Sequence, residues 1–476
     1  MSRHFYRFRP ARAVLKGFNE LEHQEIYFSR PQDLNDPLEG FKDLFWRGDE
    51  IVWMNLFKHY VLCLMQSVML ALTEGPDHEF DNEQNFVLSN EDTLPSADHK
   101  NDYRRMCQLF FQHEDVAALP KLLSARASPV RRNELSTYLR TIHMHALNAV
   151  LTSFEDSGQI PHRPPQDPIR AAGARRIPLK EMIEGLNRSE LEHRERADFA
   201  DVFSAATNAA WMQTTLINDY NGTSFTQGRA WRTLVSDLPS RHPFHLERLL
   251  YRDWYVACFV ADPSQAAMWG HYADSHKGVC LKFRTQPNSA GQPSILLKGI
   301  NVEAHDANAD VGVPMTLHQV KYAGKSPEVD FFRSLGAITG PMLRYWFADA
   351  SGKRSELFEH TVGRTDESRQ RYWETSTALI TTKLEDWRHE AEYRIVVRPL
   401  SDLSSPEKRK FRYSFECLEG IIFGIQTSAT DKLDIIRIIE KKCRAAGRKD
   451  FEFHQAYYSS SLGRIATQPL RLINFA

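Results

Sequence analysis

The spacing of apolar residues changes twice along this chain, and no other sequence feature constrains its fold as strongly. From Phe41 to Arg252, apolar residues recur three and four positions apart, which is the spacing of helices. The longest such segments are Ile51–Leu72, Leu135–Phe154 and Ala197–Ile217. On both sides of this region the pattern is that of short strands, as in Glu25–Ser29 and Trp254–Val260. A helical body therefore interrupts a fold that contains strands.

The length of the chain also requires more than one compact body. At 476 residues it exceeds what a single core of ordinary size can hold. We predict an α+β fold in which residues 1–40 and 251–476 form one domain, and residues 41–250 form a large all-helical insertion. Three further helices are expected in the C-terminal part, at Phe331–Ala348, Arg371–Arg388 and Thr430–Ala446.

The charge and composition of the chain exclude several classes of protein. Lys and Arg number 60 and Asp and Glu 61, so the formal net charge of -1 provides no overall field for nucleic acid or anionic lipid. Tyr60–Thr73 is the most apolar segment, and it falls short of the roughly 18 residues that a membrane span needs. The first ten residues lack the features of a secretory signal. We therefore expect a cytoplasmic protein with no membrane contact and no strong nucleic-acid signature.

Neither a disulfide framework nor a metal site is expected. The six cysteines are scattered without a CxxC pair, which in a chain of this length favours reduced core residues. His143 and His145 lack further ligands at the spacing of a zinc site. The sequence also lacks the glycine motif of dinucleotide-binding dehydrogenases and a complete P-loop. We predict no metal cofactor.

Four short segments carry a resemblance to a known family. They read HFYRFRP at 4–10, IYFSRPQDLNDPLEG at 26–40, AAMWGHYADSHKGVCLKF at 266–283 and DWRHEAEYRIV at 386–396. As an ordered set, they resemble the bacterial domain of unknown function 2971 family. The helical region between the second and third segments has no counterpart in this resemblance. We expect the four segments to meet in one cleft.

A second likeness concerns the order of chemical groups in these segments. A strand with Arg or His, a strand followed by a helix that runs from Ser to Tyr, and a Glu at the start of a strand are similar to the three-part signature of ADP-ribosyltransferases. This likeness implies small mixed or antiparallel sheets around a cleft. It also implies that NAD binds there as a substrate.

The first two segments supply candidate binding residues. In the strand of HFYRFRP, alternation places Tyr6 and Arg7 on opposite faces, and the planar guanidinium of Arg7 is suited to a phosphate or a ribose. The alternative is an edge strand with solvated arginines. In the loop after the next strand, Ser29, Asn35 and Asp36 either face the ligand or only turn the chain.

The third segment is predicted to form a helix over 266–278. Trp269, Tyr272 and His276 then share one face, because their positions are three and four residues apart. Tyr272 is suited to stacking on nicotinamide, His276 to ligand binding and His271 to acid–base catalysis near neutral pH. The alternative is an aromatic stripe in the core with histidines as polar core residues.

The fourth segment contains three charged residues at alternating positions, Glu390, Glu392 and Arg394. They share a face if the strand already begins at Glu390. A fixed carboxylate stabilises the oxocarbenium-like state through which the glycosidic bond of NAD breaks. By analogy with the transferase signature we assign this role to Glu392, with Glu390 second and Arg394 as a structural ion partner in the site. The alternative is a surface salt-bridge cluster.

These residues lead to two functional hypotheses and a less favoured third. The first is an NAD-utilising enzyme that transfers ADP-ribose to a macromolecule or hydrolyses NAD, in a bacterial defence or toxin setting. The second is a non-enzymatic module of a defence system that senses a nucleotide or a peptide. The third is a magnesium-dependent nuclease, which the neutral charge disfavours. The macromolecular acceptor or trigger is unknown, and we expect the helical insertion to provide the partner contacts.

Overall fold

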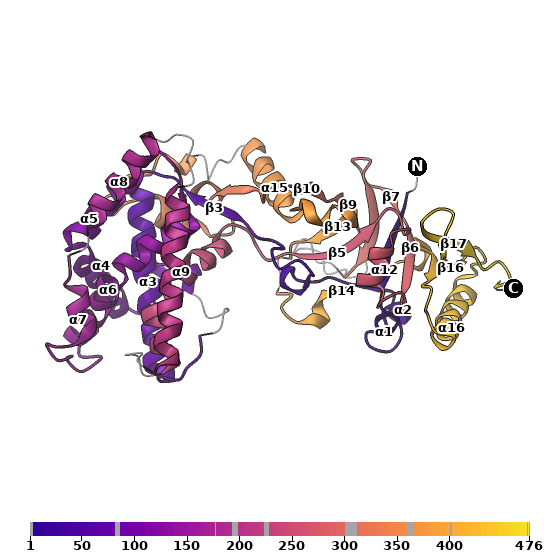
Figure 1. Cartoon of the computed structure of the whole chain (residues 1–476), viewed down its shortest axis with the longest axis horizontal. Coiled ribbons are helices and arrows are strands. Elements are labelled where there is room, and N and C mark those ends of the chain that lie inside the picture. Colours follow the sequence, from indigo (N-terminus) through magenta and orange to yellow (C-terminus); the bar gives the residue numbers. More distant parts are fainter. Residues whose placement is uncertain are drawn as a thin grey trace. The chain divides into compact units, whose positions relative to one another are not determined.

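The computed structural model divides into two compact units (Figure 1). The α+β unit comprises Met1–Phe41, Asp253–Pro327 and Thr377–Ala476, and the helical unit comprises Lys42–Arg252 and Glu328–Ser376. The structure describes residues 3–80, 86–176, 178–192, 199–222, 228–299, 312–359, 366–399, 402–473 and 475.

Residues 328–376 differ from the prediction, because they belong to the helical unit and not to the α+β unit. Helix α13 (Gly340–Phe347) is buried through Trp346 and Phe347, and the side chain of Asn55 donates to the Trp346 carbonyl at 3.0 Å. Strand β11 (Glu328–Asp330) pairs in parallel with β3 (Asp43–Trp46). These long-range contacts leave no periodic signal in the sequence. The pattern therefore predicted that the helical unit includes the region from about residue 41 to 250, but not that it also includes residues 328–376.

The helical unit is built from helices that match the periodic segments of the sequence. The three long predicted helices are confirmed as α3 (Glu50–Glu74), α6 (Arg132–Asp156) and α9 (Phe199–Tyr220). The other helices of this unit that the structure describes are α4 (Ala97–Phe111), α5 (Glu114–Ser124), α7 (Pro168–Gly173), α8 (Leu179–Glu192), α10 (Arg229–Arg232), α11 (Leu238–His245) and α13, joined by short 3-10 and π turns and by strand β4 (Val130–Arg131).

Helix α3 is the central helix of this unit. The Asp49 carboxylate caps it by accepting from the backbone N–H groups of Ile51 and Val52. It is the one described helix that is long and apolar enough to cross a membrane, and 67% of its most apolar window is buried inside the fold. That burial is typical of a core helix.

The α+β class with mixed and antiparallel pairing is confirmed, in a sheet larger than expected. Twelve described strands form it in the order β17-β16-β15-β6-β1-β5-β13-β9-β8-β14-β2, with β7 beside β8. Only β15 and β16 run parallel among these pairs. The bounds are β1 His4–Arg9, β2 Glu25–Tyr27, β5 Tyr255–Val260, β6 Val279–Arg284, β7 Gln286–Pro287, β8 Pro293–Lys298, β9 Val313–Gln319, β13 Glu392–Val397, β14 Lys410–Tyr413, β15 Leu418–Phe423, β16 Glu452–Ser459 and β17 Arg464–Pro469.

The sheet opens between β1 and β5. Strand β1 pairs with β6 at every residue from His4 to Arg9, but with β5 only at Tyr6, opposite Val260. Further along β5, an isolated bridge joins Val256 to Ser29, which follows β2. Beyond the pair Tyr6–Val260, β1 and β5 separate, so side chains of both strands face a common space. The candidate site lies in this space.

Helices and short turns complete the α+β unit. Helix α16 (Ala429–Ala446) confirms the helix expected over Thr430–Ala446, and α12 (Ala266–Tyr272) follows β5. The other described elements are α1 Ala11–Val14, α2 Glu20–His23, the 3-10 helices η1 Pro31–Asp33, η8 Glu385–Glu390, η9 Pro406–Arg409 and η10 Phe415–Cys417, and the parallel pair β10 Lys321–Ala323 with β12 Thr382–Leu384. The main core contains Phe5, Phe28, Phe259 and Phe283, which are at most 1% exposed.

Two predicted helices differ from the structure. The helix expected over Arg371–Arg388 is α15 (Asp366–Ile380), which ends before Thr381 and Thr382; the chain then forms β12. These β-branched residues favour a strand, so the signal was present. The helix expected over Phe331–Ala348 begins only at Gly340, where Pro341 occupies a first-turn position that proline favours.

Candidate functional site

A pocket with about 770 Å³ of empty space lies where β1 and β5 separate. Seven of the eleven predicted site residues line it, which are Tyr6, Arg7, Ser29, Asn35, Tyr272, Glu390 and Glu392. The remainder is lined mostly by apolar side chains, among them Leu34, Phe259 and Met268, together with the ion-paired Arg9 and Asp33. The structure therefore brings all four resemblance segments to one pocket.

Arg7 supplies the positive charge of this pocket. It is only 6% exposed, and its guanidinium donates to the carbonyl oxygens of Tyr27 at 2.9 Å and Cys258 at 3.3 Å. Its Nε has no hydrogen-bond partner, and no carboxylate of the described chain lies within ion-pair distance of it. Burial, followed by the charge of Arg9, lowers the pKa of Arg7 to about 10, so it stays charged at neutral pH. The alternative of a solvated edge arginine is wrong for Arg7, because β1 lies between β6 and β5.

Two glutamates that line the pocket, Glu390 and Glu392, belong to a buried cluster of charges. The Lys383 ammonium lies 2.6 Å from a Glu390 oxygen and 3.2 Å from a Glu392 oxygen. The Arg394 guanidinium binds Glu392 at 2.8 and 3.0 Å and binds Glu39 at 2.6 and 2.8 Å. All five side chains are at most 5% exposed. A surface salt-bridge cluster, the alternative from the sequence, is therefore excluded.

The cluster keeps Glu392 ionised. Burial alone would raise the pKa of its carboxyl group, but the charges of Arg394 and Lys383 outweigh burial and lower this pKa to about 2. Burial lowers the pKa of Lys383, and the charges of Glu392 and Glu390 reverse that effect and raise it overall. By formal charge, three carboxylates meet two cations, which leaves one excess negative charge in this cluster.

Two tyrosines orient the carboxylates. The Tyr272 hydroxyl donates to Glu390 at 2.5 Å, and burial together with the Glu390 charge raises the pKa of Tyr272, so that it remains a donor. The Tyr322 hydroxyl accepts from the backbone N–H of Glu392 at 2.9 Å. Burial is the main cause that raises the pKa of Tyr322 to about 12.

The backbone between the two glutamates differs from the prediction. Strand β13 begins at Glu392, whereas Glu390 ends the 3-10 helix η8, so the two residues do not share a strand face. Ala391 between them has a left-handed conformation with φ 44°. Both carboxylates nevertheless reach Lys383, because that one residue reverses the chain direction.

The predicted helix over 266–278 is shorter than expected. Helix α12 ends at Tyr272, and Asp274, Ser275 and His276 have positive φ, so His276 does not share a helix face with Tyr272. Its ring stacks 6.4 Å from Trp269, and it does not line the pocket. Trp269 is fully buried against Phe8, as the core alternative proposed.

His271 does not belong to the pocket. Its side chain is exposed, although it lies next to Tyr272 in α12. A helix places consecutive residues about 100° apart, so only one of the two can face the pocket. The assignment of His271 as an acid–base catalyst is therefore wrong in its geometry.

The predicted binding residues also include Asp36, Asn35 and Arg394, and of these three Asn35 lines the pocket. Asp36 is buried and accepts from the Leu38 N–H at 2.9 Å, which is a turn-forming role, and it does not line the pocket. Asn35, beside it, is exposed and lies at the pocket edge. Arg394 is fully buried and holds Glu392 from behind without lining the pocket, as expected of a structural ion partner.

Lys383 and Glu39 were missed in the sequence. Lys383 was placed within a helix, although the preceding Thr381 and Thr382 favour a strand. Glu39 precedes Gly40, whose φ of +74° and close approach to Trp254 require glycine. The glycine is a turn signal in the sequence, but it does not single out the carboxylate beside it. Both residues became recognisable only through their buried partners.

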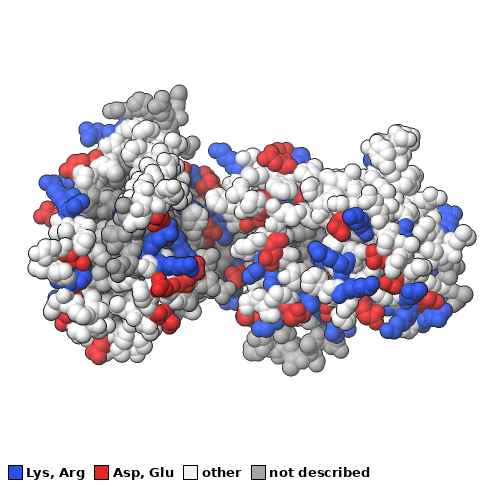
Figure 2. All heavy atoms as spheres, turned by 60° about the horizontal axis from the view of Figure 1, so that its bottom comes forward, with Lys and Arg blue, Asp and Glu red and all other residues white. Residues whose placement is uncertain are grey.

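Cysteine and metal chemistry offer no rival site. The six cysteines are free, and three of them, Cys63, Cys280 and Cys443, are buried. In the part of the chain that the structure describes, no group of three or more His, Cys, Asp or Glu residues is arranged to hold a metal ion. On the face shown in Figure 2, acidic and basic side chains are interspersed, without one large patch of either sign.

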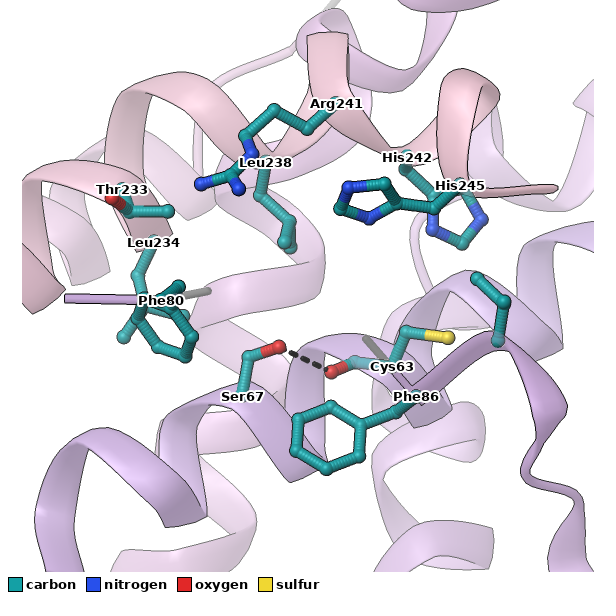
Figure 3. A pocket seen from close by; sticks show the side chains of 11 residues that line it. Cys63, Ser67, Phe80, Phe86, Thr233, Leu234, Leu238, Arg241, His242 and His245 are labelled. Carbon is teal, nitrogen blue, oxygen red and sulfur yellow. Dashed lines mark hydrogen bonds between the residues drawn. The ribbon is translucent and has the colours of Figure 1, made fainter. Parts of the chain in front are cut away.

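A second pocket, with about 430 Å³ of empty space, lies between α3 and α11 of the helical unit. Figure 3 shows Arg241, His242 and His245 facing Cys63 and Ser67, whose hydroxyl donates to the Cys63 carbonyl at 2.8 Å. Burial lowers the pKa of His245 to about 4 and raises that of the Cys63 thiol, so both are neutral at pH 7. We take the first pocket as the candidate site, because the resemblance segments meet there and ion pairs surround its Glu392.

Comparison with known proteins gives one match. Residues 268–395 match the family model described as "Protein of unknown function (DUF2971)", which confirms the resemblance over this range. The range contains most of α12, Lys383 and both pocket glutamates, and it excludes Arg7 and Glu39. No curated protein and no solved structure matches the chain.

Proposed function

We propose that this chain, whose residues 268–395 belong to a family of unknown function, is an enzyme that uses NAD as a substrate in the pocket between β1 and β5. It either transfers ADP-ribose to a macromolecule or hydrolyses NAD. The observation that carries the proposal is that one pocket is lined both by the unpaired cation of Arg7 and by glutamates of a cluster with one excess carboxylate.

The Arg7 side suits the pyrophosphate of NAD. A buried guanidinium without an anionic partner is costly, and a ligand phosphate would supply the missing charge. Its Nε–H has no acceptor among the described residues, and the guanidinium charge favours hydrogen bonds to an anionic oxygen in the pocket. Tyr6 and Ser29, which also line the pocket, add polar groups near this end.

The Glu392 side suits the nicotinamide riboside. When the bond between ribose and nicotinamide breaks, positive charge develops on the ribose, and nicotinamide leaves as a neutral ring with the bonding electron pair. Glu392 remains ionised and is held rigidly by Lys383 and Arg394, so it stabilises that charge without reorganisation. The half-buried Tyr272 ring provides a flat surface for nicotinamide, and its hydroxyl keeps Glu390 in place.

Nicotinamide release from NAD by the full-length protein tests this proposal. Glu392→Gln retains the shape and removes the charge, and we expect a loss of about 10²–10³-fold in rate. Glu419→Gln is the matched control, because Glu419 is also an ion-paired glutamate of the α+β unit but is half-buried and lies outside the pocket. A folded Glu392→Gln, Glu390→Gln double variant with unchanged rate would overturn the assignment.

A non-enzymatic sensor of a nucleotide or a peptide is the second candidate. It is favoured by the fact that both oxygens of Glu390 and of Glu392 already accept from protein donors, as in a rigid recognition site. Calorimetric binding of NAD without nicotinamide release distinguishes it from the enzyme. On the family resemblance alone, we propose a cytoplasmic role in bacterial defence or as a toxin for either candidate, with a macromolecular acceptor or trigger.

A further inference from the structure

Helix α9 presents its apolar side outward, opposite to the usual arrangement in a globular protein. Its inner side packs against α6 through small or polar residues, such as Ala200, Ser204 and Asn208. Asn208 donates to the Asn133 carbonyl at 3.1 Å, so polar contacts hold this side. The outer face of α9, as we define it, consists of Phe199, Val202, Phe203, Ala206, Ala209, Ala210, Gln213, Leu216, Ile217 and Tyr220.

The exposed apolar surface of α9 is large enough for a stable interface. Val202, Leu216 and Ile217 are 58–69% exposed and Tyr220 is 90% exposed. Phe199 and Phe203 add further exposed area on the outer face. With roughly 150–200 Å² per side chain, these six residues leave on the order of 600 Å² of apolar surface in water. Each partner contributes about 600–1,000 Å² to a standard protein interface.

The charge of α9 limits what can cover this face. Asp201 and Asp219 are the charged residues of the helix; both are half-buried on the side away from the outer face, and the helix contains no Lys or Arg. Helices that lie on a membrane surface carry Lys and Arg along their polar side, so a lipid surface fits poorly. A charged protein partner would also gain nothing here. An uncharged apolar face is matched by another face of the same kind.

The shape of the outer face matches a crossing of two helices. The small residues Ala206, Ala209 and Ala210 form its centre, and larger side chains occupy both ends. Two helices that cross approach most closely at the crossing point and diverge towards their ends. Alanines at the centre permit the close approach, and larger residues fill the widening gap.

We propose that the outer face of α9 is the contact between two copies of this chain, with their α9 helices crossing antiparallel at Ala209 and Ala210. A two-fold axis at that point places Phe199 of one copy near Tyr220 of the other, because the two residues are at nearly equal distances from the axis along the helix. The interface is then self-complementary and closed, as in a C2 dimer.

The mass of the full-length protein in solution tests the dimer. We expect twice the chain mass of 55.0 kDa by analytical ultracentrifugation, and the mass of one chain for the Leu216→Glu variant. The control is Asn101→Glu, which adds the same charge at an exposed position of α4 and leaves the dimer intact. A wild-type protein that is monomeric at about 100 µM overturns the proposal, since interfaces of standard size have micromolar or tighter Kd values.

Cysteine cross-linking tests the crossing point. Ala209→Cys lies beside the two-fold axis, so we expect a disulfide-linked dimer under mild oxidation. Phe199→Cys is the matched control, because it lies about ten residues from the axis and hence roughly 30 Å from its symmetry mate. Cross-linking through position 199 in preference to 209 would exclude the antiparallel crossing. Equal helical content of both variants, measured by circular dichroism, shows that the helices remain folded.

Discussion

Both units bury ion pairs, as Arg126 and Glu134 show in the helical unit, but the helical unit also buries three histidines that the fold keeps neutral. In the α+β unit, Glu392 and Arg394 are buried as ions, each held by an opposite charge. In the helical unit, His59, His143 and His242 are at most 2% exposed, and burial lowers the pKa of each. Their hydrogen-bond partners are neutral carbonyl and hydroxyl groups, or are absent, so these histidines are buried as uncharged rings.

The difference shows two ways of burying a polar group. A neutral histidine needs only one or two hydrogen bonds, as when the His59 Nε2 contacts the Val87 carbonyl at 2.9 Å and the His143 Nε2 contacts the Leu234 carbonyl at 2.6 Å. A buried ion needs an opposite charge and a fixed geometry. Beside the pocket, buried ion pairs fix the charge of Glu392, and in the core of the helical unit three histidines are buried without charge.

Acidification should destabilise the helical unit more than the α+β unit, and this is the largest effect that we expect. The folded pKa of His59 and of His143 is about 4, below the unfolded value of 6.5. The unfolded state therefore binds more protons, so stability is complete above pH 6.5 and falls as the pH drops from 6.5 towards 4. With His242, the loss by about pH 4.5 is on the order of 5 kcal/mol or more, comparable to the whole stability of a domain.

Peptide-resolved hydrogen exchange, corrected for the intrinsic effect of pH, measures this loss in each unit. We expect α3 and α6 to lose protection near pH 5, whereas β6 and β13 keep it. Glu392 contributes stability above its unfolded pKa of 4.5 and loses it only as the pH falls from 4.5 towards 2. Simultaneous loss in both units at pH 5 would contradict the comparison.

Removing one cation from the ion cluster should have the second-largest effect. Arg394→Met leaves Glu39 without its Arg partner and Glu392 with Lys383 alone, and we expect a loss of about 3–5 kcal/mol in the free energy of unfolding. Urea unfolding measures it. Arg388→Ala removes an exposed arginine that is paired with Glu385, and it should leave the midpoint unchanged. If both substitutions lowered the free energy of unfolding equally, the buried ion pairs of Arg394 would contribute no more to stability than the exposed pair of Arg388.

Replacing one buried histidine should reduce the pH dependence of the helical unit by a smaller amount. His242→Phe keeps the aromatic contact with Tyr60, whose ring lies 5.0 Å away, and removes a titratable group whose Nε2 has no partner. Because the unfolded pKa is 6.5, the difference in stability between pH 8 and pH 5 should shrink by about 2 kcal/mol. Urea unfolding at the two pH values gives this difference, which is independent of any change in packing. An unchanged difference would show that His242 is not the titrating group.

The smallest expected effect is that of removing the Tyr272 hydroxyl, which contacts the ion cluster through Glu390. Tyr272→Phe removes the hydroxyl that donates to Glu390 and keeps the ring, and we expect a loss of about 1 kcal/mol in the free energy of unfolding. Lys383 still binds Glu390, which limits the loss. A loss as large as that of Arg394→Met, measured under the same conditions, would show that the hydroxyl is an essential member of the cluster.

Much of the local structure could be predicted from residue patterns, because periodicity and alternation act over a few neighbouring residues. The helices α3, α6 and α9 follow the spacing of apolar residues, and β5 and β13 follow β-branched segments. The pocket residues Arg7 and Glu392 were also predicted, Arg7 from strand alternation within a resemblance segment and Glu392 by analogy with the transferase signature. His271 was assigned wrongly, because the side of α12 that faces the pocket depends on packing, which adjacent residues do not reveal.

The sequence by itself determined which segments form helices and strands, the class of the fold and the chemical types of residue that the pocket uses. Only the tertiary structure decided that residues 328–376 join the helical unit, that β1 and β5 part beyond one residue pair, and that Lys383 meets Glu390 and Glu392. These features depend on contacts between residues far apart in the chain. Their energies arise from burial and charge pairing in the folded state, which no local pattern records.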